Sequence, residues 1–195
     1  MEEKYSMILR NRARDSQDLL GGNSMLTLKH TVPAALSALL LSTTLAQAGD
    51  YLSLNGGYYD AIRHKDPAAV FGAEYRFDSF QYGIRPIIGG FMTTDNGTYG
   101  YAGFDWDVAL LPNQLYLIPN FAVGAYGEGH GRQLGGTLEF RSGIELDYQF
   151  PNTQRVGVAL NHISNAGIYN HNPGEENVIA TYSIPVATIG HWMGR

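Results

Sequence analysis

Hydrophobic and polar residues alternate along most of the chain beyond residue 50, and the apolar residues of that region show no helical period. Consecutive side chains of a β-strand point to opposite faces, so this pattern predicts strands with one apolar and one polar face. Residues typical of turns, such as Gly, Pro, Asn and Asp, separate the alternating segments. Eight strands are therefore predicted, at 51–59, 69–77, 83–92, 98–109, 115–126, 136–150, 154–162 and 177–185.

The sixth predicted strand shows the two faces most clearly. Its apolar positions share one parity and its charged positions the other: Leu138, Phe140, Ile144, Leu146, Tyr148 and Phe150 against Glu139, Arg141, Glu145 and Asp147. Four charged side chains on one face are costly in an apolar core unless they are paired. A small barrel in a bilayer can pair them in its polar lumen while the apolar face meets lipid. A soluble ligand-binding barrel would instead have its apolar residues inside and its charged residues outside. Parity alone does not distinguish the soluble barrel from the membrane barrel.

The segment 25–48 has the parts of a secretory signal peptide, with a basic start, an apolar run and the small-x-small cleavage signature Ala46-Gln47-Ala48. Residues 1–24 are charged and patternless, which indicates an extension or a misread start upstream of the signal. The mature domain is then 49–195. A buried helix at 32–45 is the alternative interpretation, and that stretch is too short to span a bilayer.

The composition of the mature domain narrows the protein class further. It carries 8 Lys and Arg against 14 Asp and Glu, a net charge of −6, which argues against a general nucleic-acid binder. It contains no cysteine, so its stability must come from a core, a closed barrel or a membrane. With the signal peptide and the even strand count, this predicts an all-β fold: an eight-stranded antiparallel transmembrane β-barrel in the outer membrane of a Gram-negative cell.

The stretch 162–176 carries the components of triad chemistry: the hydroxyl of Ser164, the base His162 and two carboxylates, Glu175 and Glu176. If the N-terminus lies in the periplasm, the long loops follow the odd-numbered strands, and this stretch lies at the outer-leaflet end. These outward loops are predicted at 60–68, 93–97, 127–135 and 163–176.

Parity predicts which way these side chains face. His162 and Ser164 continue the apolar parity of the seventh strand, and Glu176 is in phase with the apolar set of the eighth, whereas Glu175 is not. Ser164, His162 and Glu176 are therefore expected on the lipid-facing wall of two neighbouring strands. Polar side chains placed against lipid cost free energy, so a polar cluster on this wall indicates a function.

The same residues resemble the signature of the PagL-type lipid A 3-O-deacylases, or acyloxyacyl hydrolases: His162-Ile163-Ser164-Asn165-Ala166-Gly167, then Asn172-Pro173-Gly174 and Glu176. The similarity covers about 160–185, and the twelve residues from Ser164 to Glu176 match the family's spacing. The resemblance implies that Ser164 is the nucleophile, His162 the general base, Glu176 the residue that orients the imidazole, and Asn165 a donor to the oxyanion. It also implies a barrel enzyme without a cofactor, acting on lipid A of lipopolysaccharide in the outer leaflet.

Other interpretations stay open at this point. A non-catalytic barrel with a structural or adhesive role would show the same strand pattern around a decayed motif. The cationic residues at 63–65 either meet lipid A phosphates or belong to a solvated loop. No two of His162, His171 and His191 share the close spacing of metal ligands, so no metal site is predicted. The sequence does not decide whether the protein forms a homodimer.

Overall fold

Nine strand segments follow the predicted alternation in the computed structural model, which describes residues 49–192. The strands are β1 (Tyr51–Tyr59), β2 (Ala68–Arg76), β3 (Ile84–Thr93), β4 (Thr98–Trp106), β5 (Val108–Leu111), β6 (Leu115–Gly127), β7 (Leu138–Gln149), β8 (Arg155–Ser164) and β9 (Glu175–Pro185). A 3-10 turn, η1 (Gln81–Gly83), precedes β3, and a short helix, α3 (Val186–Trp192), follows β9. The predicted extension 1–24 and signal peptide 25–48 lie outside the described residues.

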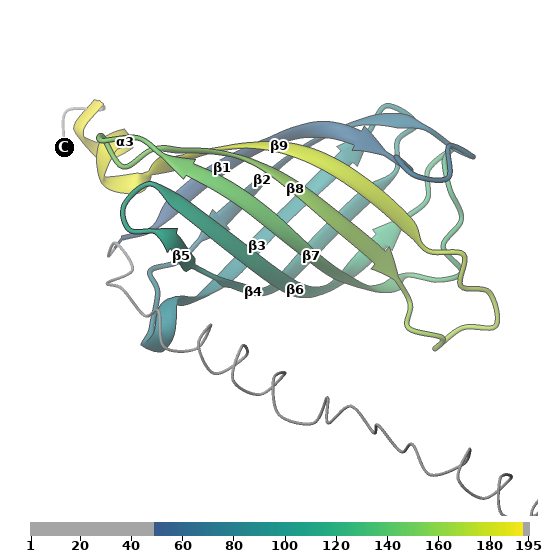
Figure 1. Ribbon diagram of the computed structural model, residues 1–195. Coiled ribbons are helices and arrows are strands. Elements are labelled where there is room, and N and C mark those ends of the chain that lie inside the picture. Colours follow the sequence, from purple (N-terminus) through teal and green to yellow (C-terminus); the bar gives the residue numbers. More distant parts are fainter. Residues whose placement is uncertain (1–48, 193–195) are drawn as a thin grey trace, which may run out of the picture. The chain divides into compact units, whose positions relative to one another are not determined.

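The strands form one closed antiparallel barrel (Figure 1). Apart from β4 and β5, consecutive strands pair with each other, and β1 pairs with β9, so that Tyr51 lies opposite Pro185. Both β4 and β5 pair with β6, one after the other, and together they occupy a single place in the barrel. The eight-stranded antiparallel barrel is therefore confirmed, with its fourth strand in two parts.

The fourth strand is broken at Asp107, although continuous alternation predicted a single strand over 98–109. The backbone N–H of Asp107 donates to the carbonyl of Gly83 at 2.9 Å, outside the strand ladder. Its carboxylate lies 2.9 Å from Arg85 and 3.1 Å from Arg155. Contacts from η1, β3 and β8 thus converge on Asp107, where the strand is interrupted, and no pattern within 98–109 predicts them.

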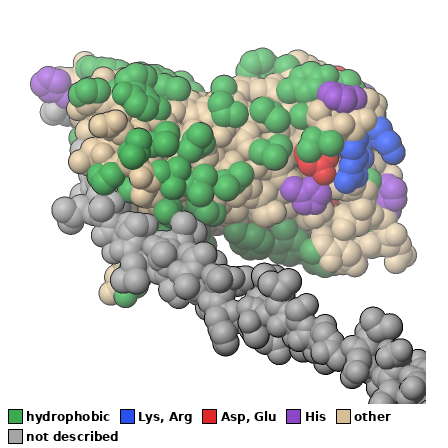
Figure 2. All heavy atoms as spheres, in the orientation of Figure 1, with side chains coloured by type: hydrophobic (Ala, Val, Ile, Leu, Met, Phe, Trp, Pro, Cys, Tyr) green, Lys and Arg blue, Asp and Glu red, His purple; other side chains and the backbone are tan. Residues whose placement is uncertain are grey.

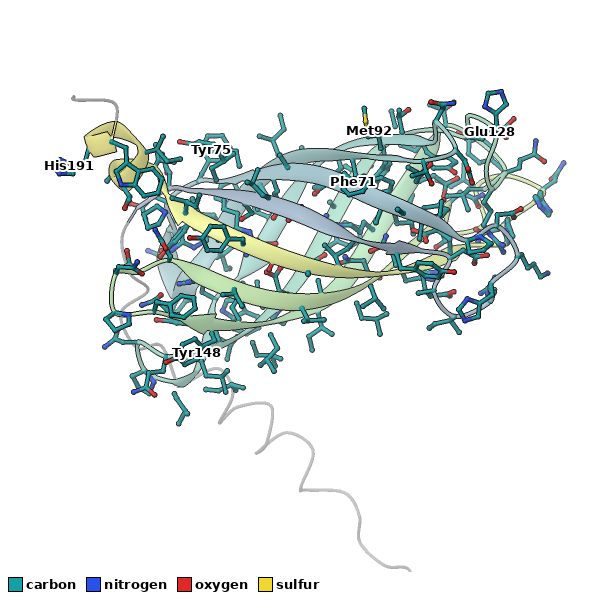
Figure 3. The ribbon with its side chains drawn as sticks, turned by 90° about the horizontal axis from the view of Figure 1, so that it is seen from above. Phe71, Tyr75, Met92, Glu128, Tyr148 and His191 are labelled. Carbon is teal, nitrogen blue, oxygen red and sulfur yellow. The ribbon has the colours of Figure 1, made fainter. Side chains whose placement is uncertain are left out.

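The outer wall of the barrel is apolar. Apolar side chains are exposed on the outer face of β2, β3, β6 and β8, including Phe71, Ile88, Phe121 and Val158. Hydrophobic side chains cover much of the barrel wall in Figure 2, and Met92 and Tyr148 project from it in Figure 3. Exposed apolar side chains over a whole barrel wall are what a lipid-facing surface requires.

The lumen holds the charged side chains of the opposite parity. Arg76 contacts four carboxylates there, at 2.8 Å from Glu74, 3.2 Å from Asp105, 2.7 Å from Glu145 and 3.7 Å from Asp147. Arg141 pairs with Glu74 at 2.9 Å, while its guanidinium lies 3.9 Å from the centre of the Tyr101 ring. Buried charges need such partners, and the four carboxylates around Arg76 find theirs in its guanidinium.

The two ends of the barrel differ. The longer connections 60–67, 128–137 and 165–174, with the short turn 94–97, lie at one end, here called the loop end. The short connections 112–114 and 150–154, the segment 77–83 and α3 lie at the other. Glu128 and His191 mark these two ends in Figure 3. No helix among residues 49–192 is long and apolar enough to cross a membrane.

Candidate active site

The predicted catalytic residues lie at the loop end, on the neighbouring strands β8 and β9 (Figure 1). The two strands pair in antiparallel register with His162 opposite Glu176, and the loop 165–174 connects them. Side chains directly opposite each other in such a pair have Cβ atoms about 5 Å apart. The register therefore brings together an imidazole and a carboxylate that are fourteen residues apart in sequence.

His162 and Glu176 are within hydrogen-bonding distance, with Nδ1 of the imidazole 3.2 Å from Oε1 of the carboxylate. The side chain of His162 is 43% exposed and that of Glu176 is 14% exposed. Both share the outward parity of Val158 on β8 and Val178 on β9. Because Nδ1 faces the carboxylate, Nε2 is left to exchange a proton with another group.

Ser164 ends β8 two residues after His162 and shares its outward parity. The serine is half-buried and lies opposite Phe140 of β7. Within residues 49–192, no hydrogen bond joins Ser164 to His162. The imidazole and the carboxylate are thus in contact, and the serine is beside them on the same wall without being bonded to them. Catalytic hydrogen bonds of unliganded enzymes often tighten only when substrate binds.

Glu175 is directed into the barrel. Its carboxylate is fully buried, accepts a hydrogen bond from the Asn177 side chain at 2.9 Å, and lies 3.3 Å from the backbone nitrogen of Asp60. Adjacent strand residues point to opposite faces, which is why the two consecutive glutamates separate. Only Glu176 reaches the imidazole.

Asn165 is buried between two loops. Its side-chain Nδ2 donates to the carbonyl oxygen of Leu134 at 2.8 Å and to that of His171 at 2.9 Å, and its Oδ1 accepts from the backbone N–H of Gly167 at 3.0 Å. Gly135 lies against the same contact, where a side chain would collide with the carbonyl of His171. The predicted oxyanion donor thus ties the loop 128–137 to the loop 165–174.

No group of three or more His, Asp or Glu side chains within residues 49–192 has an arrangement that would hold a metal ion.

The family assignment follows from comparison with known proteins. A family model described as lipid A 3-O-deacylase (PagL) matches residues 68–185, more than half of the chain. The chain belongs to the PagL family. Members of this family are ester hydrolases, so the predicted enzyme class is confirmed together with the family. No curated protein matches this PagL-family chain.

Two solved structures resemble this PagL-family barrel. The crystal structure of the outer membrane enzyme PagL has a TM-score of 0.54 and 23% identity, covering 69% of this chain and 99% of that one. The Yersinia pestis outer membrane protein Ail has a TM-score of 0.44 and 12% identity, covering 71% of this chain and 100% of that one. With the family match, the fold confirms the predicted outer-membrane β-barrel.

Tertiary structure adds three residues to the surroundings of this PagL-family site. Ser142 of β7 is exposed on the outer wall directly opposite His162. Arg63 of the first loop pairs with Glu176 at 3.3 Å, and Gly174 packs against the imidazole. The sequence left residues 63–65 either as contacts for lipid A phosphates or as part of a solvated loop, and neither alternative included the contact of Arg63 with Glu176. The sequence contains no signal for the other two, because they depend on strand register and loop packing.

Proposed function

We propose that this protein removes the 3-O-linked acyl chain of lipid A through a triad of Ser164, His162 and Glu176. The hydroxyl of Ser164 attacks the ester carbonyl while Nε2 of His162 takes its proton. Glu176 holds the imidazole by Nδ1 and stabilises the imidazolium. The tetrahedral intermediate expels the sugar 3-hydroxyl, which receives the proton from His162, and an acyl group remains on Ser164. Water, activated by the same imidazole, then releases the fatty acid and regenerates the serine.

The observation that carries this proposal is the 3.2 Å contact between Nδ1 of His162 and Oε1 of Glu176 on the outer wall. A neutral imidazole that donates from Nδ1 presents a basic Nε2, as a general base of a serine hydrolase must. Both strands carry exposed apolar side chains below this pair, Val158 and Leu160 on β8 and Val178 on β9. The site is thus open to the lipid phase, where the acyl chains of lipid A lie.

Asn165 is proposed to assist at the oxyanion. A donor placed there contributes about 3–4 kcal/mol to transition-state stabilisation in acyl transfer. Because Nδ2 of Asn165 already donates to two loop carbonyls, this role requires the amide to exchange one of them for the oxyanion. Loss of turnover without loss of thermal stability in Asn165→Ala would support the oxyanion role. Lower thermal stability, with activity reduced only in proportion to the loss of folded protein, would support a purely structural role.

Lipid A in the outer leaflet is the proposed substrate, and no cofactor takes part in the steps above. The sequence leaves open whether the protein forms a homodimer in the membrane, and cross-linking in native membranes would decide this.

The deciding experiment is mass spectrometry of lipid A from cells that make the wild type, Ser164→Ala or Ser142→Ala. The wild type should remove one hydroxyacyl chain from lipid A. Ser164→Ala should lose this activity by roughly 10⁴-fold or more, as expected when a triad nucleophile is removed. Ser142→Ala is the matched control, because it deletes the other outward hydroxyl next to His162. Loss of activity in Ser142→Ala with retention in Ser164→Ala would refute the assignment of the nucleophile.

The alternative of a structural or adhesive barrel without catalytic activity makes the opposite prediction. A purified, folded wild type that leaves lipid A unchanged would support that alternative.

A further inference from the structure

The first loop, 60–67, reaches the catalytic carboxylate through Arg63. One terminal nitrogen of the guanidinium, Nη2, lies 3.3 Å from Oε1 of Glu176. The other, Nη1, donates to the carbonyl oxygen of Pro173, three residues before that glutamate. A planar guanidinium can bind two acceptors at fixed angles, which a lysine ammonium cannot do in the same way. Arg63 therefore fixes the side chain of Glu176 and the backbone that leads to it.

The contact is made on the same oxygen that faces the imidazole. Oε1 of Glu176 lies near both Nδ1 of His162 and Nη2 of Arg63, while Oε2 is buried and has no hydrogen-bond partner within residues 49–192. A carboxylate held by two donors on one oxygen has little freedom to rotate. Without the guanidinium, Oε1 would be held by the imidazole alone.

Arg63 is itself held in position by the fold of its loop. Asp60 accepts backbone hydrogen bonds from Lys65 at 2.6 Å and from Asp66 at 2.9 Å, which closes the loop on itself. The backbone N–H of Ala61 donates to the carbonyl of Glu176 at 2.7 Å, and this joins the loop to β9. These hydrogen bonds fix the loop backbone and so hold Arg63 next to Glu176.

A second arginine secures the same segment from the inside. Arg132 is 4% exposed and donates from Nε to the carbonyl of Gly174 at 2.9 Å, while its Nη1 pairs with Asp60 at 3.2 Å. A Cβ atom on Gly174 would lie 2.8 Å from Cε1 of His162, so this glycine forms a wall against the imidazole. Arg63 and Arg132 thus hold 173–176, which touches the imidazole both through Gly174 and through the Glu176 carboxylate.

We infer that Arg63 is a positioning residue, which acts on the reaction by holding Glu176 and 173–176 against His162. The inference rests on the proposed triad. Arg63 raises the fraction of molecules whose imidazole is correctly oriented and so increases the reactivity of Ser164. Its side chain is 39% exposed, so the contact is partly open to solvent and its effect is moderate.

The test measures the reactivity of Ser164 separately from lipid A binding. An alkyl fluorophosphonate reacts with an activated serine by forming a P–O bond and releasing fluoride, and it carries no sugar or phosphate headgroup. Heat-modifiable gel mobility establishes that each variant is a folded barrel. Arg63→Ala should be labelled about 5-fold more slowly than the wild type, the range expected for a partly exposed charge pair. Arg63→Glu, which places a second carboxylate beside Glu176, should be slower still.

Matched variants isolate the role of the guanidinium. Lys65→Ala removes a positive charge from the same loop, and since only the backbone of Lys65 contacts Asp60, its labelling should equal that of the wild type. Arg63→Lys should fall between the wild type and Arg63→Ala. Added guanidinium chloride at low millimolar concentration should restore part of the Arg63→Ala rate, whereas equal sodium chloride should not. With lipid A as substrate, Arg63→Ala should lower kcat and leave KM nearly unchanged.

The outcomes separate this inference from the function on which it rests. Wild-type labelling of Arg63→Ala, with a raised KM for lipid A, overturns the inference and makes Arg63 a ligand of an anionic group of the substrate. A folded Arg63→Ala that is slow but not rescued by guanidinium or by Arg63→Lys also overturns it. A folded wild type that the probe does not label overturns the proposed triad and the inference together.

Discussion

Arg76 is the residue whose removal should cost the barrel the most stability. Its guanidinium lies within 4 Å of four carboxylates in the lumen, and Asp105, Glu145 and Asp147 have no second ion-pair partner among residues 49–192. Arg76→Met replaces the cation with an apolar side chain of similar length. Three buried carboxylates then lose their neutralising partner at once.

The expected loss of unfolding free energy is about 3–5 kcal/mol, the cost of breaking one buried ion pair by removing a partner. The four contacts do not add, because they share one charge and the carboxylates can take up protons or water. The side chain of Arg76 is only 4% exposed, so solvent screens little of the effect. Arg76→Met with Asp105→Asn should recover part of the loss, since one uncompensated charge is then removed.

Urea unfolding in lipid vesicles, extrapolated linearly to water, measures this free energy. Val158→Leu on the outer wall is the control, because it changes an apolar side chain without touching the lumen. A loss below about 1 kcal/mol for Arg76→Met, or no recovery in the double variant, would refute the conclusion that this network of ion pairs stabilises the lumen.

Three further predictions concern the site and the lipid-facing wall. Glu176→Gln should lower kcat by about 10²–10⁴-fold by favouring the wrong imidazole tautomer, while Glu175→Gln should keep most of the turnover; assays of both folded variants on lipid A decide this. Gly174→Ala should reduce turnover more than Gly167→Ala, although both glycines have positive φ (61° and 79°), because only a Cβ at position 174 would meet the imidazole. Equal losses of turnover in the two variants would contradict this explanation. Val158→Arg should destabilise the barrel by about 2–4 kcal/mol in vesicles, and an unchanged urea midpoint would show that this position does not face lipid.

The strand pattern and the opposite orientations of Glu175 and Glu176 were both accessible from the sequence. Alternation has a period of two residues and is a local property, so it predicted the strands to within a few residues and separated the lumen face from the lipid face. The same parity selected Glu176 over Glu175, and the structure directs these two side chains to opposite faces. The break at Asp107 was missed because its cause lies in contacts with Gly83, Arg85 and Arg155, far away in the chain.

By itself, the sequence determined the fold class, the family motif and the face on which the site lies, since each follows from residue types at short spacing. Only the tertiary structure decided what surrounds that motif. The register between β7 and β8 brought Ser142 beside His162, and loop packing brought Arg63 to Glu176 and tied Asn165 to the carbonyl of Leu134 in another loop. Such contacts depend on the register between strands and on how separate loops fold together, and neither leaves a periodic trace in one chain.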